Sequence, residues 1–161
     1  MILGLDISTS ITGVTVLDST GNIVYNEAWD TRKFKNLFEK ASHVKEEILD
    51  LYDKYGFSSY GHADEIIEHI FIEQILQSFR SGFSSAKTLS TLSRFNGILS
   101  WMFYDTFELV PEYVAATTAR KLAGLKIPRG TKAKEVVLKY VEQQELLKVE
   151  WLTEHPEWAA I

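Results

Sequence analysis

The first nine residues constrain the fold most strongly, because they place one acid inside an otherwise apolar run. Residues 1–9 are Met-Ile-Leu-Gly-Leu-Asp-Ile-Ser-Thr, a pattern typical of a buried β-strand that ends in small polar residues. A carboxylate is costly to bury unless a cation or hydrogen-bond donors satisfy it. Asp6 is therefore either a cap for the turn at Ser8 and Thr9 or a metal ligand at the centre of a sheet. The strand alone leaves both interpretations open.

Length and composition indicate one soluble globular domain. The 161 residues suffice for one sizeable core, and 45% apolar and 24% charged residues are ordinary for soluble proteins. The absence of cysteine excludes a disulfide framework, a thiolate zinc site and a cysteine nucleophile. The sequence shows no cleavable leader and no apolar run near the roughly 18 residues that span a bilayer. We therefore expect a cytoplasmic protein with no membrane partner.

Charge is distributed unevenly along the chain, whose net charge is −5. Residues 74–104 contain no acid, and residues 120–139 contain seven basic residues against Glu135 alone. Two basic stretches in an acidic protein can form a phosphate-binding face that the net charge hides. Each stretch taken singly is equally consistent with a solvated helix face.

Alternating apolar residues and turn signals predict a three-stranded antiparallel meander at the start of the chain. Its strands are residues 1–9, 12–17 and 23–29, and turn-forming residues 18–22 join the last two. Apolar spacing then predicts helix, strand, helix, strand and two helices, over residues 34–55, 65–74, 85–107, 109–116, 117–122 and 131–147. Thr117 or Thr118 is expected to cap the short helix. The sequence thus predicts a mixed α/β single domain over residues 1–161.

Three sequence blocks, in order, resemble those of the RuvC Holliday junction resolvases of the ribonuclease-H-like superfamily. The first is Leu3-Gly-Leu-Asp-Ile-Ser-Thr9 with Thr12-Gly13, and the second is Phe71-Ile-Glu-Gln74 before a flexible segment and a long helix. The third extends from Ala119-Arg-Lys-Leu-Ala-Gly124 to Gly130-Thr-Lys-Ala-Lys-Glu-Val136. Phage and poxvirus members of the family are the most similar in kind. The resemblance implies a ribonuclease-H-like mixed five-stranded sheet flanked by helices.

The resemblance also implies a metal-dependent, structure-selective endonuclease that hydrolyses Holliday junctions or other branched DNA in recombination and repair. In such nucleases, acids on adjacent strands bind two Mg²⁺ ions per site, for which Mn²⁺ can substitute. One ion activates a water and the other stabilises the leaving 3′ oxygen. Asp6 and Glu73 match the first two acids, so both are implied to be catalytic metal ligands. Without the resemblance, Glu73 is better interpreted as an acid at the solvent-facing end of a strand than as a metal ligand.

The chain departs from the family at its end. The family's last helix supplies a further acid pair, usually Asp-x-x-Asp, and this sequence has no such pair. Residues 158–161 lie about where that helix should begin, so we expect the natural protein to be longer. Glu154 and Glu157 have the spacing to substitute, but Pro156 between them disrupts a regular helical turn.

Five residues are implied by the resemblance to contact DNA: Phe79, Arg80, Arg129, Lys132 and Lys134. The basic residues of positions 129–134 match those that hold phosphates beside the metals. Phe79 and Arg80 lie in the segment that inserts at the branch point, where an aromatic ring can stack on an unpaired base. The alternative is that Phe79 packs beneath its own loop.

A homodimer is the expected assembly, because a four-way junction has two-fold symmetry and needs two symmetric cuts. The helix at residues 85–107 is apolar enough to be buried on more than one side. Four of its residues are expected to supply much of the interface: Leu92, Phe95, Leu99 and Met102. Simple core burial is the alternative for this helix.

Two other functions fit parts of the pattern. A ribonuclease-H-like ATPase or sugar kinase also begins with a strand-borne Asp, but it needs a second domain that 161 residues do not supply. A non-catalytic DNA-binding relative with an incomplete site fits the missing acid pair. A nuclease assay with Mg²⁺ on branched and linear DNA separates both from the endonuclease.

Overall fold

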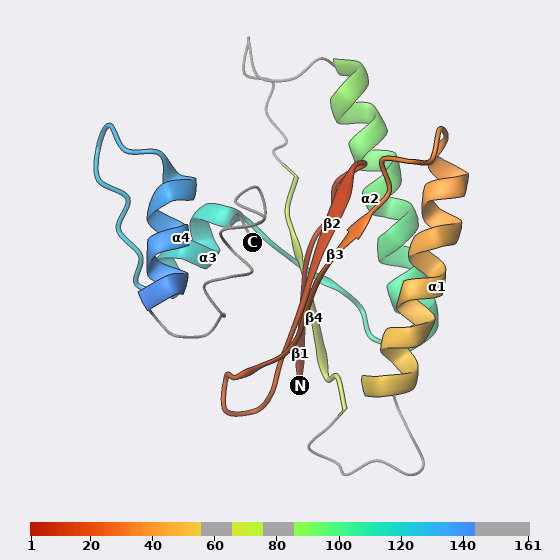
Figure 1. The fold of residues 1–161 in the computed structure, drawn as a ribbon, viewed down its shortest axis with the longest axis horizontal. Helices are drawn as coiled ribbons and strands as arrows, with labels where there is room; N and C mark the ends of the chain where they lie inside the picture. The colour runs from red at the N-terminus through yellow and green to blue at the C-terminus, as the bar shows by residue number, and fades with distance from the viewer. Residues whose placement is uncertain (56–65, 76–85, 144–161) are drawn as a thin grey trace. The chain divides into compact units, whose positions relative to one another are not determined.

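The computed structural model describes residues 1–55, 66–75 and 86–143 (Figure 1). The chain divides into two compact units, Met1–Val114 and Ala115–Ile161, and each is described by itself below. The predicted single domain over residues 1–161 stays a prediction. Phe79, Arg80, Glu154 and Glu157 lie outside the described residues.

The first unit contains a five-stranded mixed sheet in the order β3-β2-β1-β4-β5. Its strands are β1 (Ile2–Asp6), β2 (Ile11–Leu17), β3 (Ile23–Asp30), β4 (His69–Glu73) and β5 (Glu112–Val114). β1, β2 and β3 form the predicted antiparallel meander. β4 pairs in parallel with β1, and β5 pairs in parallel with β4. The predicted mixed five-stranded sheet is therefore confirmed.

The turn between β2 and β3 owes its shape to Asp18 and Gly21. The Asp18 carboxylate accepts hydrogen bonds from the Thr20 backbone N–H at 2.8 Å and the Asn22 backbone N–H at 2.9 Å. The Thr20 hydroxyl also donates to it, and these bonds lower the Asp18 pKa to about 2. Gly21 adopts φ of 88°, which glycine tolerates without a steric penalty. The predicted turn chemistry of residues 18–22 is confirmed.

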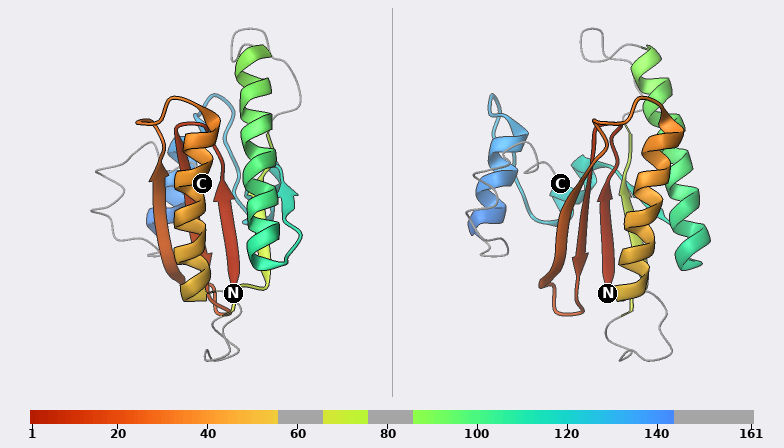
Figure 2. Two further views of the ribbon diagram at one scale, coloured as in Figure 1. Left: turned by 90° about the vertical axis from the view of Figure 1, so that its right-hand side faces the viewer. Right: turned by 45° about the vertical axis from the view of Figure 1, so that its right-hand side comes forward.

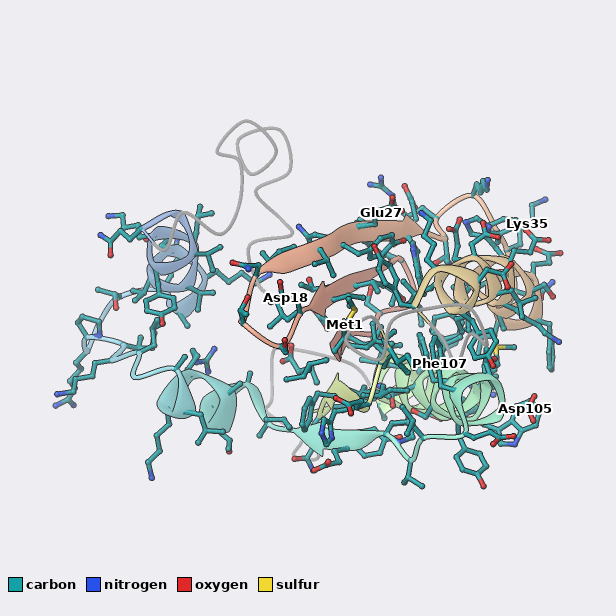
Figure 3. The ribbon with its side chains drawn as sticks, turned by 90° about the horizontal axis from the view of Figure 1, so that it is seen from below. Met1, Asp18, Glu27, Lys35, Asp105 and Phe107 are labelled. Carbon is teal, nitrogen blue, oxygen red and sulfur yellow. The ribbon has the colours of Figure 1, made fainter. Side chains whose placement is uncertain are left out.

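Two helices, α1 (Leu37–Tyr55) and α2 (Ala86–Phe107), cover one face of the sheet (Figures 1 and 2). They enclose the core with alternate residues of β1 and β4, including Leu3, Leu5, Ile70 and Ile72. Figure 3 shows Phe107 on the side of α2 toward the sheet and Asp105 on the side away from it. Within the described residues, no helix is long and apolar enough to cross a membrane.

The inner face of α2 corrects the expected dimer interface. Phe95 and Leu99 have exposed fractions of 0%, so both side chains belong to the core of one chain. The alternative of core burial is therefore right for these two residues. Trp101 and Tyr104 instead expose 60% and 49% of their surfaces. Helical spacing identified the apolar residues, but α2 is apolar around so much of its circumference that spacing did not separate its two faces.

The second unit contains the short helix α3 (Ala116–Leu122) and the helix α4 (Ala133–Gln143). α3 begins one or two residues before the expected caps, because Ala115 is its N-cap in an extended conformation and no side chain caps it. The cap prediction for Thr117 or Thr118 is therefore wrong. α3 ends before Gly124, whose φ of 71° is the left-handed conformation typical of a helix C-terminus.

Candidate active site

Asp6 and Glu73 end two neighbouring parallel strands. The parallel register of β1 and β4 pairs Leu3 with Ile70 and Leu5 with Ile72, and Asp6 and Glu73 are the next residues of their strands. Because the strands are parallel, both acids lie at the same edge of the sheet. Neighbouring strands are spaced about 4.7–4.9 Å apart. The fold thus brings together two acids that are far apart in the sequence.

Both acids also lie on the same face of the sheet. Along β1 and β4 the buried residues alternate with partly exposed ones, and the buried set faces α1 and α2. Asp6 and Glu73 belong to the partly exposed set, so they lie on the face opposite this core. The interpretation of Asp6 as part of a shared acidic site agrees with this arrangement. A role as metal ligands stays a prediction.

Small residues flank Asp6 on the other side. Its partner across the antiparallel pair is Gly13, and the partner of Gly13 on β3 is Ala28. Cross-strand partners lie on one face of a sheet, so the neighbours of Asp6 in this row are small, and Gly13 itself is buried. The Thr12-Gly13 motif noted in the sequence supplies the first of these small neighbours.

Three further acids on this sheet were not identified from the sequence, and one of them, Glu27, is paired with the core residue Val14 and so lies on the other face from Asp6. Glu112 of β5 is the register partner of Phe71, which places it on the same face as Glu73 but one strand further from Asp6. Asp30 ends β3 and is paired with Ile11 of β2. Glu112 could have been identified by placing the predicted strand of residues 109–116 in parallel beside the strand that ends in Glu73.

Asp30 is already engaged by a cation. The Arg32 guanidinium donates to both Asp30 carboxylate oxygens at 2.6–3.0 Å. These bonds lower the pKa of Asp30 to about 2. A carboxylate held by a bidentate arginine is a poor candidate for a metal ligand, because the two cations would compete for the same oxygens.

The residues present fit a magnesium site in part. Mg²⁺ takes one or two carboxylates and completes its coordination with water and substrate phosphate. Asp6 and Glu73 supply oxygen ligands of this kind at one edge of the sheet. Among the described residues, no group of three or more His, Cys, Asp or Glu side chains is close enough to hold an ion. The two acids therefore fit an open site that depends on water and phosphate.

The loop that follows Asp6 is held from inside. The Ser8 hydroxyl accepts from the Ser10 and Ile11 backbone N–H groups and donates to the Ile11 carbonyl at 2.7 Å. The Thr31 hydroxyl lies 3.1 Å from the carbonyl oxygens of both Thr9 and Ser10. Residues 8–10 thus form a closed turn attached to the end of β3.

The basic residues expected to contact DNA lie in the second unit. Arg129, Lys132 and Lys134 are all exposed. Gly130, with φ of 87°, turns the chain between Arg129 and the start of α4. The Lys132 ammonium forms an ion pair with Glu135 at 3.1 Å, with side-chain exposures of 83% and 63%. A pair this exposed contributes little to stability and can exchange its carboxylate for a phosphate.

No protein-family model matches the sequence, and no curated protein matches it either. Solved structures do match. One is Thermus thermophilus RuvC in complex with a Holliday junction substrate, with a TM-score of 0.61 and 14% sequence identity over 91% of this chain and 80% of that chain. Another is a Thermus thermophilus RuvC structure, with a TM-score of 0.56 and 17% identity over 88% of this chain and 78% of that one. This chain therefore has the ribonuclease-H-like fold of RuvC.

Proposed function

We propose that this protein is a metal-dependent endonuclease that cleaves Holliday junctions or related branched DNA. The observation that carries the proposal is the parallel register of β1 and β4, which ends in Asp6 on one strand and Glu73 on the other. The fold shared with a RuvC that is bound to a Holliday junction supports the substrate class.

Asp6 and Glu73 would hold Mg²⁺, or Mn²⁺ in its place. Two bound ions would supply an activated water and would neutralise charge on the leaving 3′ oxygen. The two carboxylates fix where that charge is neutralised, because each is anchored by a strand of the central sheet. The basic residues of the second unit, Arg129, Lys132 and Lys134, would bind backbone phosphates. Lys132 would first have to exchange its ion pair with Glu135 for a phosphate.

A homodimer would align two such sites with the two-fold symmetry of a junction. The exposed side of α2 is the surface that favours this assembly, since Trp101 and Tyr104 are aromatic residues that lie one helical turn apart. Gly97 lies one turn before Trp101, and a Cβ at this position would meet nothing within 4 Å. A glycine within an exposed helix surface allows the close approach of another backbone.

A non-catalytic junction-binding protein is the second candidate. The observation in its favour is that the described residues hold no cluster of three metal-binding side chains. Such a protein would bind junctions through the basic residues of the second unit and leave them intact.

The experiment that separates these functions is a cleavage assay with labelled DNA. The full chain is incubated with a four-way junction or a linear duplex of the same sequence, in Mg²⁺, Mn²⁺ or EDTA. The endonuclease predicts symmetric nicks in the junction with either metal and none with EDTA or on the linear duplex. Junction binding without cleavage under every metal condition would identify the non-catalytic protein. Equal binding to both DNA forms would rule out structure selectivity.

A further inference from the structure

We propose that Lys40 is a positioning residue for Asp6, and this inference rests on the proposed metal-dependent function. The Lys40 ammonium lies on α1, on the core side of the sheet, and donates hydrogen bonds to the backbone carbonyls of Thr9 and Thr31. Thr9 is in the loop that follows Asp6, and Thr31 follows the last residue of β3. Lys40 therefore joins the loop after the proposed ligand to the end of another strand.

Thr31 completes the same attachment. Its side chain has an exposed fraction of 0%, and its backbone N–H donates to the Ser10 carbonyl at 2.8 Å. Its hydroxyl can donate to the carbonyl of Thr9 or of Ser10. Lys40 and Thr31 together fix the carbonyls of Thr9 and Ser10, only three and four residues after Asp6. We name this set of contacts the loop clamp.

The chemistry of Lys40 is unusual for a lysine in such a position. The ammonium is partly buried and donates its hydrogen bonds to neutral carbonyl oxygens, and the Asp30 carboxylate lies near enough to interact with its charge. Removing an ammonium from water is costly, so a partly buried lysine at position 40 indicates that its hydrogen bonds have a role. The three donors of an ammonium can bind several carbonyls that converge at one point, which a neutral methionine or leucine cannot do. The partners of Lys40 indicate that this role is to hold the turn after Asp6 in place.

Positioning and charge make opposite predictions for metal binding. If Lys40 affected the site only through its positive charge, its removal would strengthen binding of a divalent cation, because a repulsion would be lost. If it acts by holding the loop, its removal weakens binding, because Asp6 is less well fixed. Loss of a group that orients a metal ligand typically weakens metal binding or activity about 10- to 100-fold. Lys40 acts through the backbone, so we expect about a 10-fold loss.

The test measures Mn²⁺ binding to the full chain by the electron paramagnetic resonance signal of free Mn²⁺, without DNA. Lys40→Met and Thr31→Val should each raise the Mn²⁺ dissociation constant about 10-fold. Thr31→Ser keeps the hydroxyl and should bind nearly as the parent does. Lys45→Met makes the same change at an exposed position of α1 and should bind as the parent does. Thermal unfolding identifies any variant that does not fold, and in that case Lys40→Arg replaces Lys40→Met. It keeps the charge but changes the geometry of the donors, so it should weaken Mn²⁺ binding, whereas unchanged binding would contradict the positioning role.

A second readout is the Mn²⁺ dependence of junction cleavage. Loss of the loop clamp should raise the half-saturating Mn²⁺ concentration. At saturating Mn²⁺, the variants should regain much of the maximal cleavage rate of the parent. Unchanged or tighter Mn²⁺ binding by both Lys40→Met and Thr31→Val would overturn the inference. Asp6→Asn is the reference: if it loses Mn²⁺ binding while the clamp variants do not, only the role of Lys40 fails. If Asp6→Asn binds Mn²⁺ as the parent does, the proposed metal site itself fails.

Discussion

Leu5 of β1 is paired with Ile72 of β4 in a parallel register, and an acid follows each of them. Both apolar side chains are buried in the core, with exposed fractions of 3% and 0%. A one-residue slip of either strand would move its acid to the core face and expose its apolar residues. Packing of the core therefore fixes which face Asp6 and Glu73 share, independently of any ligand.

The first prediction separates binding from chemistry. Asp6→Asn and Glu73→Gln remove a negative charge and little volume, so both variants should bind branched DNA as the parent does and cut it at least about 100-fold more slowly. The measurement is a gel-shift titration beside a cleavage time course. Asp53→Asn is the control, because it makes the same change as Asp6→Asn at an exposed position of α1. Equal cutting by Asp6→Asn and the parent would end the claim that Asp6 is catalytic.

Lys134→Ala should weaken junction binding at every sequence tested. It should also reduce the slope of log affinity against log salt concentration by about the contribution of one phosphate contact. Lys132→Ala should act in the same direction but less, because the ion pair with Glu135 already offsets part of its charge. Fluorescence anisotropy between low and moderate salt measures both effects. Lys45→Ala on α1 serves as the control for loss of one positive charge. Unchanged affinity in the Lys132 and Lys134 double variant would contradict a phosphate-binding role.

The exposed side of α2 yields a prediction about assembly. Replacing Trp101 and Tyr104 together with alanine should shift a dimer toward monomer, because buried aromatic residues dominate the energetics of protein interfaces. Sedimentation or light scattering over a range of concentrations measures the shift. Phe38→Ala is the control, because Phe38 is also an exposed aromatic residue, at 78%, but lies on α1. A parent protein that stays monomeric at tens of micromolar would contradict the dimer.

The inner side of α2 yields a prediction about stability. Leu99 is fully buried, so Leu99→Ala should lower the free energy of unfolding by about 2–5 kcal/mol, through lost burial and the cavity that remains. Urea denaturation measures this change. Trp101→Ala on the outer side should change the free energy of unfolding of the monomer much less. Similar losses from both substitutions would contradict the assignment of the two faces.

Acid should weaken the attachment of Arg32 to the end of β3. The pKa of Asp30 is lowered to about 2 in the folded protein from an ordinary value of 3.8. The stabilisation is therefore fully present above about pH 4 and is lost as the pH falls toward 2. Asp30→Asn should be slightly less stable than the parent at pH 7 and equally stable once the pH is well below 2. The side chains are exposed, so the difference at pH 7 should be about 1 kcal/mol or less.

Much of the fold was predictable because each strand and helix carries its own periodic pattern. The meander, the strand that ends in Glu73 and the helix of residues 85–107 were all expected within a few residues. Parallel pairing of β1 and β4 follows once both are placed in this fold, so the neighbourhood of Asp6 and Glu73 was also accessible. The inner face of α2 could not be predicted from the sequence. Trp101 is as apolar as Phe95, and only the packing of the folded chain shows that Phe95 is buried and Trp101 is exposed.

The loop clamp could not be predicted for a different reason. Lys40 binds the carbonyls of Thr9 and Thr31, and a carbonyl exists at every residue, so the sequence gives no sign of which ones converge. The same reason applies to the cap of α3. Ala115 takes the cap position through its backbone conformation alone, and no side-chain pattern records that choice.

The position of β1 between β2 and β4 has a consequence for how the chain folds. β1 pairs on one side with its neighbour in sequence and on the other with a strand that follows the whole of α1. The local pairing closes a short loop, whereas the parallel pairing closes a long one and is expected to form later. Until β4 arrives, the other edge of β1 is an open template for strands from other chains. Refolding at high concentration should therefore lose protein to aggregation during this interval, after the meander has formed.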